Sequence, residues 1–385
     1  MRKVKWIFKR IMFSVINYIF ALVLKNDKVE NGILIIRLDA IGDYILFRNF
    51  IEVLKKDDKY KDKKITLIGN SAWKSIAEEF DSDYVDEFIW IERKRFLRDF
   101  KYIFTILRQI RSKKYSTVIN PMFSREFPLS ESIVKMLQAD EKIGSQGDFS
   151  NIRNYEKKIA DRYYSKLLPG SEQVLFEFER NREFFQRLLD KKIEIVKPKI
   201  ELKEEIIELD LPKKYAIIFI GASMAYRKWS VVNYAQVGLE LQKRYGLDIV
   251  LCGGKEDVEE VEKFTHLFGN NFIDLVGKTT LVELLYVLKG CTVLISNETS
   301  IPHFAVAIDV KNIFVISNGN HYVRFSPYPK EYEVNYNVIY HPKISLILAS
   351  KEADILFGKV SRLNIDEITT NTVLENIRKN YRGEL

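Results

Sequence analysis

Three short polar segments carry the residues whose types and spacing could do chemistry, and each follows an apolar run. The first, RLDAIGD at 37–43, comes directly after ILII at 33–36. Gly42 allows a tight turn, and Asp43 falls where a helix is expected to begin. Asp43 could serve as a general base. Alternatively, it is a carboxylate that the N-terminal end of the helix dipole stabilises, and the motif alone leaves both readings open.

The second segment combines small residues with two cations. Gly221 and Ser223 lie in a loop whose backbone N–H groups could face a phosphate, and Arg227 and Lys228 would neutralise its charge. A solvated basic turn is the alternative. The glycine loop beside the two cations favours the phosphate site.

The third segment, SNETSIPH at 296–303, lies between a predicted strand and a predicted helix. Helix capping would explain Thr299 and Ser300 alone. It would not explain Asn297, Glu298 and His303 in the same loop, so a ligand-binding loop is favoured.

Strands and helices must position these segments, and the apolar pattern predicts two similar series of alternating strands and helices. Short β-branched runs alternate with longer helical stretches, which predicts doubly wound parallel sheets of the α/β class. The predicted strands are 33–36, 64–68, 88–91, 117–120, 215–220, 249–252, 272–275, 292–296 and 312–316. The predicted helices are 44–56, 72–80, 96–111, 176–189, 231–245, 258–268, 281–289, 303–307 and 366–381. In such sheets, ligands bind beyond the carboxyl ends of the strands, where all three segments fall.

Composition limits the function. With 385 residues, two domains are expected, and a net charge of +8 favours anionic partners. No motif that reads nucleic acid is present, so phosphorylated small molecules and lipid headgroups are preferred. Cys252 and Cys291 are predicted to be buried thiols, and the four His residues lack the spacing of a zinc site.

The N-terminal residues differ from the rest. Basic residues flank Trp6–Phe8, and the nearly apolar stretch Ile11–Leu24 is too short to cross a bilayer. We expect an interfacial helix over 1–30. A signal peptide would need a small-residue cleavage site, which Val23–Asn26 does not offer. A helix packed on the protein's own core remains an alternative.

One acidic motif points to different chemistry. Asp81-Ser82-Asp83 matches a pattern by which some sugar transferases hold a divalent metal. Short acidic patterns recur by chance in a chain with 53 acidic residues, so we interpret this one as solvated surface and expect no metal site.

With these motifs in order, the chain resembles glycosyltransferase family 9, the heptosyltransferases of bacterial lipopolysaccharide synthesis. The resemblance rests on ILIIRLDAIGDYILFR at 33–48, IFIGASMAYRKWSVVNYAQV at 218–237 and DLVGKTTLVELLYVLKGCTVLISNETSIPHFAVAI at 274–308. Two departures leave the donor sugar open. Glu298 and Ser300 stand where the family usually has Asp and Gly, and Arg227 stands where it often has Lys.

The resemblance implies a GT-B fold of two facing Rossmann-like domains and a metal-independent, inverting transfer without a cofactor. The donor is a nucleotide-diphosphate sugar, with ADP-heptose as one candidate. Asp43 would deprotonate the acceptor hydroxyl. The implied donor-binding residues are Gly221, Ser223, Arg227, Lys228, Glu256, Asn297, Glu298, Thr299, Ser300 and His303, with Glu256 at the nucleoside ribose.

The sequence therefore predicts an interfacial helix over 1–30, an acceptor domain over 31–195, a donor domain over 196–360 and a C-terminal helix over 361–385. Its expected partners are a nucleotide sugar, a lipid-linked saccharide acceptor and the inner membrane surface, without nucleic acid. The expected location is cytoplasmic, peripheral at the inner face of the cytoplasmic membrane. A nucleotide-sugar epimerase of the same fold and a non-catalytic member of a polysaccharide assembly complex remain as alternatives.

Overall fold

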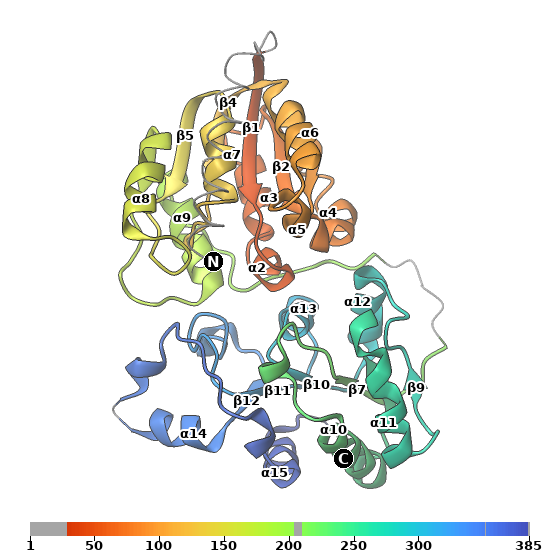
Figure 1. Ribbon diagram of the computed structural model, residues 1–385. Helices are drawn as coiled ribbons and strands as arrows, with labels where there is room; N and C mark the ends of the chain where they lie inside the picture. Colours follow the sequence, from red (N-terminus) through yellow and green to blue (C-terminus); the bar gives the residue numbers. More distant parts are fainter. Residues whose placement is uncertain (1–28, 204–209, 351, 384–385) are drawn as a thin grey trace. The chain divides into compact units, whose positions relative to one another are not determined.

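The computed structural model describes residues 29–203, 210–350 and 352–383, drawn as coloured ribbon in Figure 1. The chain divides into two compact units. Unit 1 runs to Glu172 and takes in Glu179–Glu194, and unit 2 consists of Gln173–Phe178 and the chain from Ile195 onward. The interfacial helix expected over 1–30 lies almost wholly outside the described residues.

Unit 1 is built on a six-stranded parallel sheet with the order β3-β2-β1-β4-β5-β6. Its strands are β1 (Val29–Arg37), β2 (Lys64–Asn70), β3 (Glu87–Ile91), β4 (Lys114–Asn120), β5 (Ala139–Ser145) and β6 (Lys166–Leu168). Its α-helices are α2 (Ile41–Ile45), α3 (Asn49–Lys55), α4 (Lys74–Phe80), α5 (Arg93–Phe96), α6 (Phe100–Arg111), α7 (Ser130–Met136) and α8 (Asn154–Ala160), with α9 (Glu177–Leu189) beginning in unit 2.

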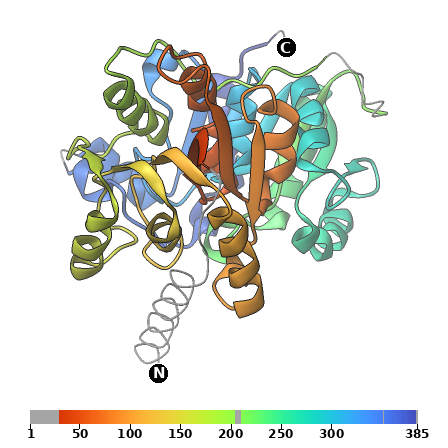
Figure 2. The ribbon, with the colours of Figure 1, turned by 90° about the horizontal axis from the view of Figure 1, so that it is seen from above.

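Both faces of this sheet are apolar because successive side chains of a strand point to opposite faces. Leu34 and Ile36 of β1 pack in one core with Ile103 and Leu107 of α6. The other face is covered by α3 and α9, and Figure 2 shows α6 and α9 on opposite sides of the strands. This explains the continuous β-branched run of β1, which is typical of a strand covered on both faces.

Unit 2 repeats the plan with the order β12-β11-β10-β7-β8-β9, again wholly parallel. Its strands are β7 (Tyr215–Phe219), β8 (Asp248–Cys252), β9 (Ile273–Asp274), β10 (Val293–Asn297), β11 (Ile313–Ser317) and β12 (Tyr336–Tyr340). Its α-helices are α10 (Val231–Tyr245), α11 (Val258–Phe268), α12 (Leu281–Gly290), α13 (Ile301–Ala307), α14 (Pro342–Ala349) and α15 (Thr370–Asn380).

One core of unit 2 joins its sheet to α10, α11 and the C-terminal helix α15. Tyr234 and Leu241 of α10, Phe264 of α11 and Ile377 of α15 are buried against alternate residues of the strands. The helix α10 ends at Gly246, whose positive φ of 60° completes a left-handed cap that glycine adopts without strain.

Two helices expected from the sequence are interrupted. The helix predicted over 44–56 is divided into α2 and α3 by i→i+3 hydrogen bonds, such as that from Phe47 N to Tyr44 O at 3.0 Å. The helix predicted over 96–111 is divided into α5 and α6, because the Asp99 side chain accepts the N–H of Tyr102 at 3.1 Å and starts α6. Six of the described strands and α-helices were not predicted, namely β5, β6, β12, α7, α8 and α14.

Candidate functional site

The strand order of unit 2 reverses between β7 and β10. β8 and β9 follow β7 on one side, and β11 and β12 follow β10 on the other. Connections leave such a point in opposite directions, which opens a crevice at the carboxyl ends of the two strands. The predicted segments at 221–228 and 297–303 both lie at this point.

Asn297, the last residue of β10, holds the two loops together. Its Nδ2 donates to the carbonyl oxygens of Ile220 at 3.0 Å and Gly221 at 3.1 Å, and its Oδ1 accepts the N–H of Trp229 at 2.9 Å. Asn297 and Trp229 are both buried. The side chain of Asn297 is thus committed to the backbone on both sides of the 221–228 loop, and it fixes the shape of that loop.

The 221–228 loop carries a hydroxyl group at Ser223 and a cation at Arg227. Ser223 is exposed and Arg227 is half-buried. Among the residues that the structure describes, the buried Nε of Arg227 has no hydrogen-bond partner. Arg227 therefore has a donor available for an anion next to a loop of small residues.

Lys228 takes a different position from Arg227. Its Nζ lies 2.7 Å from Oδ1 of Asp257, a buried carboxylate that also accepts the N–H of Gly254 at 2.9 Å through Oδ2. A Cβ at Gly221 would lie 2.6 Å from the same Oδ2, so the loop requires glycine there. Lys228 and Asp257 thus tie the β7 loop to the β8 loop, while the neighbouring Glu256 is exposed.

Glu298 is a buried acid at the same end of the sheet. Burial raises its pKa to about 7, although the Ser317 hydroxyl and Arg227 act in the opposite direction. Ser317 Oγ, at the end of β11, donates to Glu298 Oε2. The charge of Glu298 near Arg227 therefore changes in the neutral pH range.

Thr299, Ser300 and His303 start the helix α13. Thr299 Oγ1 accepts the N–H of Ile301 at 3.3 Å, and the carbonyl oxygen of Ser300 accepts the N–H of His303 at 3.1 Å. His303 Nδ1 shares a 2.8 Å hydrogen bond with the hydroxyl group of Tyr328. Burial lowers the pKa of His303 to about 4, so its ring is neutral at pH 7.

In unit 1, the order reverses between β1 and β4, and the Asp39–Asp43 loop follows β1. The buried Arg37 organises this loop: its Nη2 lies 2.8 Å from Asp39 Oδ2, and the same atom donates to the carbonyl oxygen of Asp43 at 3.3 Å. The carboxylate of Asp43 belongs to the first turn of α2, where the helix dipole favours negative charge.

The interpretation of Asp81 as solvated surface is wrong. Its carboxylate is buried and accepts bonds from Arg48 Nη2 at 2.7 Å and from the Tyr44 hydroxyl group at 2.5 Å. Through these two bonds, Asp81 holds α2 and the turn that follows it in place. Ser82 and Asp83, its neighbours in the motif, are exposed.

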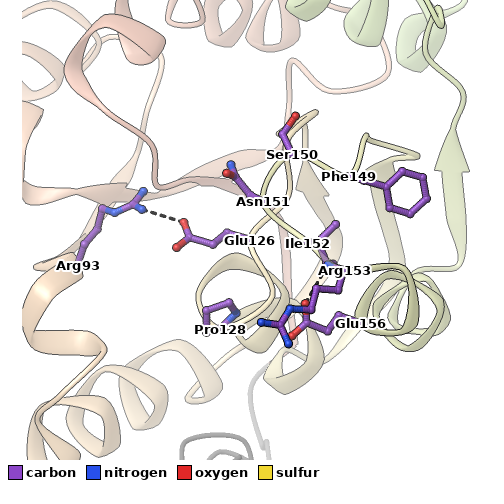
Figure 3. A pocket seen from close by; sticks show the side chains of 9 residues that line it. All are labelled: Arg93, Glu126, Pro128, Phe149, Ser150, Asn151, Ile152, Arg153 and Glu156. Atoms are coloured by element: carbon purple, nitrogen blue, oxygen red, sulfur yellow. Dashed lines mark hydrogen bonds and ion pairs between the residues drawn. The ribbon is translucent and has the colours of Figure 1, made fainter. Parts of the chain in front are cut away.

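A pocket of about 470 Å³ lies in unit 1 (Figure 3). It is lined by Arg93, Glu126, Pro128, Phe149, Ser150, Asn151, Ile152, Arg153 and Glu156. Arg93 Nη2 bonds Glu126 Oε2 at 2.8 Å, and Arg93 Nη1 donates to the carbonyl oxygen of Leu38, the residue before Asp39. The pocket offers charged groups of both signs together with amide and hydroxyl groups, which suits a polar ligand such as a saccharide.

No role was predicted for Arg37, although the first segment contains it, and Asp257, Ser317 and this pocket were not predicted. Arg37 and Asp257 stand beside residues that were singled out, and a charged residue at the end of an apolar strand was a usable signal for Arg37. The pocket had no such signal, because its lining comes from separate segments that follow β3, β4 and β5.

Within 29–203, 210–350 and 352–383, no group of three or more His, Cys, Asp or Glu residues is arranged to hold a metal ion. None of the helices in those ranges is long and apolar enough to cross a membrane.

Two separate parallel sheets, each with helices on its faces and a topological switch point, define a two-domain α/β protein of the GT-B class. The sequence profile of glycosyltransferase family 9 (heptosyltransferase) matches residues 103–351. The chain belongs to this family and is a glycosyltransferase, which confirms the predicted fold class and family.

Solved structures agree on the fold. A family 9 glycosyl transferase from Veillonella parvula shares 18% identity with a TM-score of 0.67, over 92% of this chain and 97% of the other. The E. coli heptosyltransferase WaaC with ADP shares 16% identity with a TM-score of 0.66, over 91% and 99%. The E. coli ADP-heptose lps heptosyltransferase II shares 15% identity with a TM-score of 0.62, over 91% and 98%. No curated protein matches the chain.

Proposed function

We propose that this chain transfers a sugar from a nucleotide-diphosphate donor to a lipopolysaccharide or surface-polysaccharide acceptor, with inversion and without a metal ion. The observation that carries the proposal is the Asn297-held loop at the switch point of unit 2. That loop combines small residues with Arg227, whose buried Nε has no partner among the described residues. A nucleotide diphosphate needs such donors near its phosphates.

The donor-binding residues divide into two groups by what their side chains already contact. Ser223, Arg227, Glu256, Thr299 and Ser300 are at least partly accessible, and we assign them to direct contact with the donor. Gly221, Lys228, Asn297 and His303 are engaged with the protein's own backbone or side chains, and we assign them to shaping the site. Glu298 stands between these groups, since its carboxyl group faces both Ser317 and Arg227.

The acceptor belongs to unit 1 in this proposal. Asp43 takes the proton of the acceptor hydroxyl group as that oxygen bonds to the anomeric carbon of the sugar. The bond from that carbon to the diphosphate breaks, and the leaving diphosphate keeps the electron pair. A carboxylate base and fixed donors at the leaving group can carry such a displacement. The pocket that contains Arg93 and Glu126 takes the saccharide that bears the hydroxyl group.

The candidate donor is ADP-heptose, because one of the similar structures is the E. coli ADP-heptose lps heptosyltransferase II. The protein would act in the cytoplasm, peripherally at the inner face of the cytoplasmic membrane where lipid-linked saccharides are available. No nucleic acid is required as a partner.

Thermal unfolding with ADP, GDP, UDP, CDP and their sugar conjugates, each with and without EDTA, tests the donor site. A ligand at about 100 times its Kd stabilises the folded state by about 2.7 kcal/mol, which gives a clear rise in the unfolding temperature. We expect a rise with one nucleotide that EDTA does not abolish. No rise with any nucleotide would refute the proposal and favour a non-catalytic role, whereas sugar conversion without any acceptor would indicate an epimerase.

A further inference from the structure

A large share of the positive charge of this chain lies in one segment. Residues 93–114 contain nine Lys and Arg and one acid, a net charge of +8, which equals the formal net charge of the whole chain. The remaining residues together are therefore balanced. A local excess of this size creates a field that attracts anionic surfaces.

Part of this charge is exposed on α5, on α6 and in the turn between them. We define the α5–α6 surface as Lys94, Arg95, Arg98, Phe100, Lys101 and Phe104. Phe100 is 50% exposed and Phe104 is 46% exposed, and they lie one turn apart on α6. The opposite side of α6 is buried through Ile103, Ile106 and Leu107, so the exposed aromatic rings are not part of the core.

Acids near this surface neutralise only one of its cations. Arg95 bonds Asp99 at 3.0 Å and lies 3.6 Å from Glu92. Within the described part of the chain, Lys94, Arg98 and Lys101 form no ion pair, and all three are exposed. The α5–α6 surface is therefore positively charged with apolar rings between its cations, which suits an anionic lipid bilayer: the cations attract headgroups, and the rings enter the interface.

The position of the surface links it to the pocket of unit 1. α5 begins at Arg93, a pocket residue that follows β3, and α6 begins seven residues later. The start of both helices therefore lies at the carboxyl edge of the sheet, where the pocket also lies. Phe149 on the pocket rim is 61% exposed as well.

We infer that the α5–α6 surface binds the anionic face of a lipid bilayer and holds the pocket of unit 1 at the level of the headgroups. This inference rests on the proposed function for its purpose, since a lipid-linked acceptor presents its saccharide at that level. The binding itself depends only on the surface. Three cations contribute enough that their removal weakens binding by about 100-fold at low salt, and added salt weakens binding further.

The test measures sedimentation of the full-length protein with phosphatidylcholine vesicles, with and without phosphatidylglycerol. The variant carries Lys94→Gln, Arg98→Gln and Lys101→Gln. Its matched control carries Lys243→Gln, Lys263→Gln and Lys278→Gln, three exposed lysines of unit 2 whose loss changes the net charge equally. A second pair compares Phe100→Ser with Leu346→Ser, since Leu346 is 73% exposed.

We expect binding only to vesicles with phosphatidylglycerol, a loss of about 100-fold in the triple variant, a smaller loss in Phe100→Ser, and no loss in either control. Equal binding by the triple variant and its control would overturn the inference. So would stronger binding to a double-stranded RNA than to the vesicles, with the same dependence on these cations. Nucleotide-induced thermal shifts of the same variants separate the two proposals. Vesicle binding without any nucleotide-induced shift would refute the transferase function but would still support membrane binding by the α5–α6 surface.

Discussion

The side chain of Asn297 donates a hydrogen bond to the carbonyl oxygen of Gly221 at 3.1 Å and so joins the ends of β10 and β7 across the switch point. The same side chain also bonds Ile220 and Trp229, which makes it the centre of a buried polar contact between two loops. The geometry of the proposed phosphate loop therefore depends on a residue that has little capacity left for a ligand.

Replacing Asn297 tests this dependence. Asn297→Ala leaves the buried N–H of Trp229 without its acceptor, which should lower the free energy of unfolding by about 1–3 kcal/mol. Asn297→Asp restores that acceptor but places an oxygen against two carbonyl oxygens, so it should be at least as harmful. Urea unfolding measures both, with Asn271→Ala as the exposed control. Unchanged stability in both variants would contradict the structural role.

The raised pKa of Glu298 predicts a pH-dependent stability. Burial raises this pKa to about 7, so between the usual pKa of a glutamate and pH 7 the unfolded chain is ionised while the folded chain keeps its proton. The unfolding free energy should therefore fall as pH rises through this window and level off above it. Glu298→Gln removes the titration and should gain up to about 3 kcal/mol over the wild type at pH 8, with little gain at pH 4.

Urea unfolding of the wild type and of Glu298→Gln at both pH values measures that difference. Glu256→Gln is the matched control, because Glu256 is an exposed acid in the same unit. If the wild type and Glu298→Gln differed in unfolding free energy by the same amount at both pH values, the pKa of Glu298 would not be raised by folding.

Two ion pairs of unit 2 allow a comparison of burial. The Lys228 and Asp257 side chains are 26% and 2% exposed, whereas Lys278 and Asp274 are 58% and 27% exposed. Asp257→Ala removes a buried partner of both Lys228 and the Gly254 N–H, and it should cost about 3 kcal/mol. Asp274→Ala should cost about 1 kcal/mol or less, because water already screens the pair. Similar losses of unfolding free energy in the two variants would contradict the conclusion that Asp257 stabilises the contact between the β7 and β8 loops.

β1 and β7 were recognisable because a strand covered on both faces is continuously apolar, and this placed Asp43 and Gly221 at strand ends. β5 was missed because the sequence ADEKIGS at 139–145 is mostly polar, and only its pairing with β4 makes it a strand.

The site was predicted unevenly for a similar reason. Asn297 and Arg227 stand in recognisable segments, but the sequence could not show that Asn297 faces backbone. Asp257 contacts Lys228, which lies 29 positions earlier in the chain, and such a contact exists only after folding. The burial of Asp81 is also a tertiary effect, since it depends on the distant side chains of Tyr44 and Arg48.

Arg227 should control the affinity for the donor. Its loss in Arg227→Ala removes charge-assisted hydrogen bonds to the diphosphate, which corresponds to about 10- to 100-fold weaker binding. Arg227→Lys keeps the charge but loses the fork of N–H groups, so its affinity for the nucleotide should lie between those of the wild type and Arg227→Ala. Calorimetric titration with the nucleotide found by thermal shift measures the affinities, and Arg244→Ala provides an exposed control in the same unit. Wild-type affinity in Arg227→Ala would exclude this residue from the donor site.

Replacing Asp43 should slow the transfer reaction without weakening nucleotide binding. Asp43→Asn keeps the shape of the side chain but removes the base, so kcat should fall by about 100- to 10,000-fold. In the proposed function the nucleotide binds unit 2 and Asp43 makes no contact with it, so the nucleotide affinity should stay within about twofold of that of the wild type. Asp58→Asn, at an exposed position of unit 1, controls for the loss of an acid. Single-turnover assays with donor and acceptor measure the rate, and a rate near that of the wild type would exclude Asp43 as the base. A parallel loss of nucleotide affinity would instead show that the variant disturbs more than the proton transfer, because no donor contact is assigned to this residue.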